Sequence, residues 1–90
     1  TRSMMTIAEL AERMVARALP HMEDGAARIL RDDLDAGEFE VAAITALEGA
    51  PLAMDFSDVR NLGLLAASFE TPDREIALRA IARHKARSAA

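Results

Sequence analysis

The chain has 90 residues, a length that suits one domain with a single hydrophobic core. It contains no cysteine, which excludes disulfides, thiolate metal sites and thiol catalysis. Its formal net charge of −4 argues against a protein that binds nucleic acid over its whole surface.

The first predicted helix runs from about Ile7 to Leu19. Thr6 and Glu9 have the spacing of a capping box, in which each side chain accepts a hydrogen bond from the backbone of the other. Pro20 then ends the helix, because proline has no N–H to donate. The residues before the helix, 1–5, are expected to be a cloning remnant or a disordered start. Apolar residues three and four positions apart form one stripe along this helix: Ile7, Leu10, Met14, Val15 and Ala18.

A second helix is expected to start at Asp24 as its N-cap and to end at Gly37, which suits the left-handed position after a helix. A third helix then runs from about Glu38 to Glu48. Its apolar residues lie on two sides, which predicts that it is the central helix. The predicted buried residues of the second helix are Ala27, Ile29, Leu30 and Leu34.

Gly49 and Pro51 close the third helix, and the following connector is predicted to fill the bundle with Leu52, Met54 and Phe56. Asp55 or Ser57 caps a fourth helix. Thr71 and Pro72 start a last helix that ends near Arg87. We therefore predict an all-α fold, a compact four- to five-helix bundle in a single domain over residues 6–87, with a disordered tail over 88–90. The predicted core residues are Ile29, Leu30, Phe39, Ala43, Leu47, Leu62, Ala66, Phe69 and Ile81.

Charge is distributed unevenly along the chain. Residues 23–58 contain ten acids and two arginines, a net charge of −8, whereas the stretch from Arg79 onward has a charge of +4. Cations in the last turn also suit a plain helix terminus, and no aromatic stacking residues lie nearby, so nucleic acid binding is not favoured. Glu38 suits the start of a helix. We predict an acidic protein-binding surface whose candidate contacts are Asp32, Asp33, Asp35, Glu40, Asp55 and Asp58.

Metal and catalytic sites are not favoured by the spacing of the candidate residues. An acid-rich calcium loop that starts at Asp33 would place Gly37 at the fifth position and Ile44 at the twelfth, where carboxylates are required. The two histidines, His21 and His84, have no second histidine or cysteine at helical spacing. Ser57 could be combined with Asp58 and His84 as a triad, but no oxyanion motif surrounds the serine. We expect no enzyme, metal or cofactor.

Membrane insertion and secretion are not indicated either. No run approaches the roughly 18 apolar residues that span a bilayer. The start of the chain lacks the apolar segment of a signal peptide. We therefore expect a cytoplasmic protein without membrane contacts.

The stretch from Leu34 to Phe69 resembles small bacterial immunity proteins of polymorphic toxin systems, the MafI-like group. The resemblance rests on an acidic-Ala-Gly-Glu turn at residues 35–38, an alanine- and leucine-bearing helix with Ala42, Ala43 and Leu47, and the apolar connector through Phe56. It implies an immunity protein that binds a cognate toxin domain. The alternative is a structural or regulatory helical interaction module, such as a homodimer or an antitoxin-like subunit, with no toxin partner.

Overall fold

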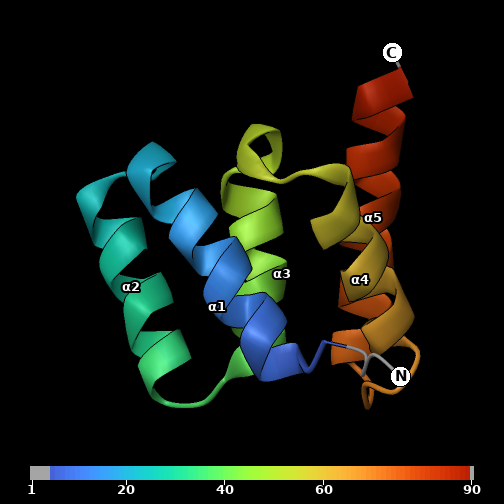
Figure 1. Ribbon diagram of the computed structural model, residues 1–90, viewed down its shortest axis with the longest axis horizontal. Helices are drawn as coiled ribbons and strands as arrows, with labels where there is room; N and C mark the ends of the chain where they lie inside the picture. The colour runs from blue at the N-terminus through green and yellow to red at the C-terminus, as the bar shows by residue number, and fades with distance from the viewer. Residues whose placement is uncertain (1–4, 90) are drawn as a thin grey trace.

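The computed structural model describes residues 5–89. Within this range the chain forms five α-helices and no β-strand, so the all-α prediction is confirmed. Figure 1 shows α3 between the α1–α2 pair and the α4–α5 pair. The elements are α1 (Ile7–Ala18), the 3₁₀ turn η1 (Leu19–His21), α2 (Asp24–Asp35), α3 (Phe39–Gly49), the 3₁₀ turn η2 (Pro51–Ala53), α4 (Phe56–Ala66) and α5 (Asp73–Ala89).

The start of α1 confirms the predicted capping box. The Glu9 backbone N–H donates to the Thr6 hydroxyl oxygen at 3.1 Å, and the Thr6 backbone N–H donates to a Glu9 carboxylate oxygen at 2.9 Å. The helix ends at Ala18, one residue before the predicted end, and tightens into η1 around Pro20. Local hydrogen bonds therefore set both ends of α1.

Gly37 adopts the predicted left-handed conformation, with φ of 80°, and ends α2. The Glu38 N–H donates to the Asp33 carbonyl and the Gly37 N–H donates to the Leu34 carbonyl, the two bonds of a Schellman motif. At the other end of α2 the prediction was wrong: Glu23 is the N-cap, Asp24 is the first helical residue, and no side chain caps the helix.

The central position predicted for α3 is confirmed by its contacts with α1, α2 and α5. Its interior side is rich in alanine, which lets neighbouring helices approach closely. Because it is covered from several directions, it buries residues on more than one side. These buried residues are Ala42, Ala43, Ile44, Ala46 and Leu47.

The predicted core is correct except at two positions. Ile29 is 62% exposed, because the inward face of α2 is set by Leu30 and residues three or four positions away, and one residue of helix rotates a side chain by about 100°. Phe39 is half-buried and packs against the core. The predicted residues that are buried are Leu30, Ala43, Leu47, Leu62, Ala66, Phe69 and Ile81.

The ends of the bundle differ slightly from the prediction. Helix α5 begins at Asp73, the residue after Pro72, and continues through Ser88 to Ala89, two residues beyond Arg87. The predicted tail at 88–90 is therefore helical as far as it is described. Residues 1–4 of the predicted start, and Ala90, lie outside the described residues.

Candidate protein-binding surfaces

Four of the six candidate acids lie around the turn between α2 and α3. Asp32, Asp33 and Asp35 occupy the last turn of α2, and Glu40 lies in the first turn of α3. Figure 1 shows this turn at the lower edge of the bundle, at the same end as the starts of α1 and α5. Asp32 and Asp35 are exposed, and the other two are half-buried. These four predicted contacts therefore share one end of the molecule.

Further acids, distant in sequence, join the same end. A hollow of about 220 Å³ beside the start of α3 is lined by Glu38, Glu40 and Asp73. Asp73 is the first residue of α5, and Glu70, in the preceding turn, lies close enough to Glu40 to repel its charge. The predicted contacts include neither of these last two residues, nor Glu38, which was predicted to serve the start of the third helix and is its N-cap. We call the whole set the acidic end: Asp32, Asp33, Asp35, Glu38, Glu40, Glu70 and Asp73.

The pKa of Glu40 is shifted by its surroundings at this end. Partial burial raises the pKa of its carboxyl group, and the Asp73 carboxyl, through a side-chain hydrogen bond and through repulsion, acts in the same direction, as does the charge of Glu70. Within residues 5–89, no acid of the acidic end forms an ion pair with arginine, lysine or histidine. The negative charges of this surface are therefore not neutralised by direct ion pairs within the described residues.

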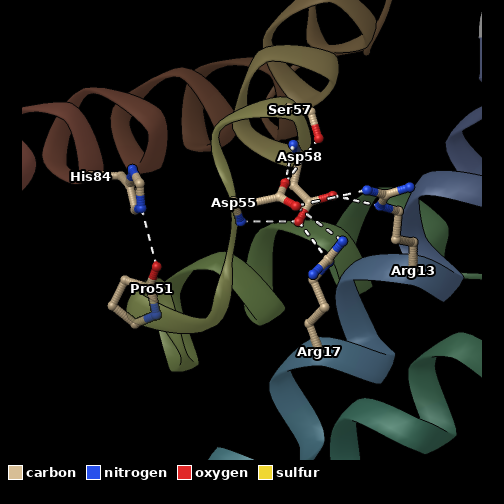
Figure 2. Close-up of polar contacts among 7 residues, drawn as sticks. All are labelled: Arg13, Arg17, Pro51, Asp55, Ser57, Asp58 and His84. Carbon is tan, nitrogen blue, oxygen red and sulfur yellow. Dashed lines mark hydrogen bonds and ion pairs between the residues drawn. The ribbon is translucent and has the colours of Figure 1, made fainter.

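The other two candidate acids, Asp55 and Asp58, lie where α4 begins against α1. Figure 2 shows both carboxylates pointing toward Arg13 and Arg17. Arg13 Nε donates to Asp58 Oδ1 at 2.9 Å, and Arg17 Nη2 lies 3.0 Å from Asp55 Oδ2. Arg17 Nε lies 3.0 Å from Asp58 Oδ2, close enough for an ion pair, but the two atoms do not form a hydrogen bond. We call these four residues the arginine–aspartate cluster.

Hydrogen bonds within the start of α4 complete the cluster. The Asp58 N–H donates to Asp55 Oδ1 and the Asp55 N–H donates to Asp58 Oδ2, each at 3.2 Å, so the two aspartates form a capping box. The Ser57 hydroxyl donates to Asp55 at 2.9 Å. This bond lowers the pKa of Asp55 most, the Asp58 N–H and the charge of Arg17 lower it further, and burial opposes them.

The cluster removes Asp58 from the predicted partner contacts. Its side chain is 0% exposed and is bound to two arginines that are 42% and 36% exposed. Asp55 keeps 47% of its side chain exposed but is paired with Arg17. Because both charges are already balanced, these two acids hold the start of α4 on α1 rather than extend the acidic end.

An apolar groove of about 490 Å³ lies between α4 and α5. Val59 and Ile81 line it and are buried, and Gly63 lines it without a side chain. Phe56 and Leu64 also line the groove but are 79% and 54% exposed. We call this feature the α4–α5 groove. Single exposed apolar residues are ordinary, but Phe56 and Leu64 lie around one hollow, which makes the groove a candidate binding surface.

The exposed residues of the groove and connector overturn one packing prediction. Leu52 is 92% exposed and Phe56 79% exposed, so neither fills the bundle as predicted. Met54 alone of the three is buried, at 7% exposure. Met54 and Asp55 connect η2 to α4, and of the three predicted residues only Met54 joins the buried core.

The residues of the imagined triad have other partners. The Ser57 hydroxyl donates to Asp55, and Asp58 binds arginine. His84 Nε2 lies 3.1 Å from the Pro51 carbonyl oxygen, which links α5 to η2, as Figure 2 shows. Ser57, Asp58 and His84 therefore form no proton relay in this structure. Among residues 5–89, no group of three or more histidines or acids is arranged to hold a metal ion.

Comparison with protein-family models, with curated proteins and with solved structures finds no match to this chain. In the part of the chain that the structure describes, no helix is both long and apolar enough to cross a membrane. The surfaces themselves therefore carry the functional argument: an acidic end whose acids form no ion pair within residues 5–89, an internally paired arginine–aspartate cluster, and an apolar groove.

Proposed function

We propose that this protein is a non-catalytic immunity protein that neutralises a cognate toxin domain by binding it through the acidic end. One observation carries the proposal: seven acids from α2, α3, α5 and the turns before α3 and α5 gather on one end, without a cation paired to any of them within residues 5–89. Such a surface is costly to the isolated protein and favourable to a cationic partner.

The physical argument concerns the charge of the partner. A toxin that acts on nucleic acid needs a basic surface to hold phosphate. An acidic inhibitor is attracted to that surface, associates faster, and competes with the substrate for it. Burial and then the carboxyl groups of Asp73 and Glu70 raise the pKa of Glu40, and the repulsion between these carboxylates would be relieved when cations approach.

The position of the acidic end also supports the proposal. The acidic-Ala-Gly-Glu turn, residues 35–38, is one of the three elements on which the resemblance to MafI-like immunity proteins rests, and it lies within this surface. Asp32 and Asp33 are unfavourable near the C-terminus of α2, because the helix dipole is negative there. Binding a basic partner is a reason to retain them.

Co-expression tests the proposal directly. The proposal predicts that a neighbouring gene encodes a toxin-like domain that arrests growth when expressed, and that this protein restores growth. Replacing all acids of the acidic end by their amides should abolish rescue without unfolding the bundle, which circular dichroism checks. Full rescue by the folded amide variant would place the interface elsewhere.

Association kinetics provide a sharper test with matched charge. Asp32→Lys combined with Asp33→Lys should slow association by about tenfold at low salt and change dissociation less. Glu12→Lys combined with Glu23→Lys changes the net charge equally, outside the acidic end, and should have a smaller effect. The difference should fade as added salt shortens the screening length from about 10 Å at 0.1 M to about 3 Å at 1 M. Equal slowing by both pairs would assign the effect to total charge alone.

The alternative function is a structural or regulatory helical interaction module. The observation in its favour is the α4–α5 groove, which is apolar and exposes Phe56 and Leu64. A protein with no toxin-like neighbour gene, and with binding abolished by changes in the groove but not at the acidic end, would be such a module.

A further inference from the structure

The α4–α5 groove differs from the acidic end in both shape and chemistry. It runs along about two turns of each helix, from Phe56 to Leu64 on α4 and from Ile81 to Ala89 on α5. Each stretch has nine residues, whose eight steps rise roughly 12 Å, the length over which a bound helix presents apolar anchors at positions i, i+3 or i+4, and i+7. A helix is therefore the element whose dimensions fit this groove.

Gly63 is the second feature of the groove that needs an explanation. It lies inside α4, where glycine is less favourable than alanine. A Cβ atom at this position would meet only Ile81 Cδ1, at an ordinary contact distance of 3.8 Å, and Gly63 has no positive φ. Neither packing nor backbone conformation therefore requires glycine. A partner backbone that approaches the groove closely supplies a reason.

The charged residues at the rim of the groove indicate which charge a partner should have. Arg60 on α4 and Lys85 on α5 line it, both exposed, and within residues 5–89 neither forms an ion pair. A second copy bound by two-fold symmetry would bring the same groove, with the same cations, against this one. Like charges at short distance disfavour that pairing, whereas acidic side chains would complement it.

We propose that the α4–α5 groove binds an amphipathic helix of a partner protein, whose apolar face packs over Gly63 and whose acidic flanks pair with Arg60 and Lys85. This proposal does not depend on the immunity function, because it concerns a different surface and a partner segment of the opposite charge.

The probe is a fluorescein-labelled peptide of about 18 residues, long enough to form a helix, with leucines at i, i+3, i+7 and i+10 and glutamates on both flanks. A second peptide has the same leucines and lysine in place of each glutamate. Fluorescence anisotropy should show saturable binding of the acidic peptide and at least about tenfold weaker binding of the basic one. Amide NMR shifts should change at Gly63, Leu64 and Ile81.

Variants of the groove make the test specific. Phe56→Ser should weaken binding of the acidic peptide several-fold, whereas Leu78→Ser, which removes a 49% exposed leucine of α5 outside the groove, should not. Gly63→Ala should raise Tm, because alanine favours the helix, and yet weaken binding. Opposite signs for stability and binding separate a docking role from a structural one.

Charge reversal completes the test. Arg60→Glu combined with Lys85→Glu should reverse the preference toward the basic peptide, whereas Arg28→Glu combined with Arg31→Glu, on α2, should leave it unchanged. Acidic-end variants should leave peptide binding intact, so failure of the immunity proposal would be seen separately. Four outcomes would each overturn the proposal. They are equal binding of the two peptides, no saturable binding, amide NMR shift changes outside the groove, and a dimer that light scattering detects and Leu64→Glu dissociates.

Discussion

Acidic side chains meet at two helix starts in this bundle, but with opposite neighbours. At the start of α4, Asp58 is 0% exposed and bound by two arginines of α1. At the start of α3, Glu40 faces Asp73 and Glu70 and has no cation paired with it within residues 5–89. Residues of the same chemical type therefore serve the fold in one place and remain available to a partner in the other.

The packing of α1 produces this difference. Arg13 and Arg17 are four residues apart, so they project from the same face of α1, and that face meets the start of α4. The starts of α3 and α5 instead bring acids from both helices together. The comparison shows that a run of acids in a sequence does not reveal the use of each one. The packing of the helices determines which acids pair with arginine and which remain unpaired at the surface.

The largest effect should follow from removing the buried charge. Asp58→Ala should lower the free energy of unfolding by about 2 to 4 kcal/mol, because it removes half of a capping box and leaves two arginines without their shared partner. The arginines are partly exposed and can regain water, which limits the loss. Urea unfolding followed by circular dichroism measures it.

Asp73→Ala is the matched control at the acidic end. It removes an acid from a helix start too, but one that repels Glu40, so the loss of a favourable dipole interaction and the relief of repulsion oppose each other. We expect a change within about 0.5 kcal/mol in either direction. If both alanine variants lost similar stability, the distinction between the two helix starts would be incorrect.

Gly37 gives the next effect, since it shapes the turn that carries the acidic end. Its φ of 80° suits glycine, and nothing lies within 4 Å of an added Cβ, so any loss comes from the backbone alone. Gly37→Val should cost roughly 1 to 2 kcal/mol of unfolding free energy. Gly25→Ala, inside α2 at ordinary φ, should instead be neutral or stabilising. A tolerated valine at position 37 would contradict this account of the turn.

The sequence predicts the fold best where the signals are local. The Thr6–Glu9 capping box and the left-handed Gly37 each depend on residues a few positions away, and both are confirmed. Ile29, Leu52 and Phe56 failed because hydrophobicity alone does not identify the side of a helix or connector that another element covers. Burial depends on which elements pack against a helix, so the sequence of that helix alone does not determine it.

The candidate surface was predictable only in part for the same reason. The acids around Gly37 are neighbours in sequence, so the pattern identified them as a group. Asp73 and Glu70 join them through the packing of α5 beside α3. The Arg13–Asp58 bond joins residues 45 positions apart. The Asp-x-x-Asp spacing at residues 55–58 could have identified these two acids from the sequence, because it is the spacing of a capping box and indicates a structural use of both.

The smallest effect, and the most direct comparison, is the opposite pH dependence of the two helix starts. The pKa of Asp55 is lowered from 3.8 in the folded protein, so its contribution to stability is present above that value and is lost as pH falls through the folded pKa. The pKa of Glu40 is raised from 4.5, so its contribution is present below 4.5 and is lost as pH rises through the folded pKa. Removing each charge should therefore give changes of opposite sign at neutral pH.

Glu40→Gln should raise Tm at pH 7 by about 1 to 3 °C, which corresponds to roughly a few tenths of a kcal/mol for a solvent-screened group. The gain should vanish below pH 4.5, where the wild-type glutamate is already protonated. Asp55→Asn should lower Tm at neutral pH, with the loss shrinking as pH falls below 3.8, because the wild-type aspartate then loses its charge as well. Thermal unfolding of both variants and wild type, followed by circular dichroism at a series of pH values, measures the two differences on one scale.

Differences of the same sign would mean that Glu40 has a compensating cation in solution. In that case the acidic end would be as internally balanced as the arginine–aspartate cluster, and its proposed role in binding a basic partner would lose its physical basis.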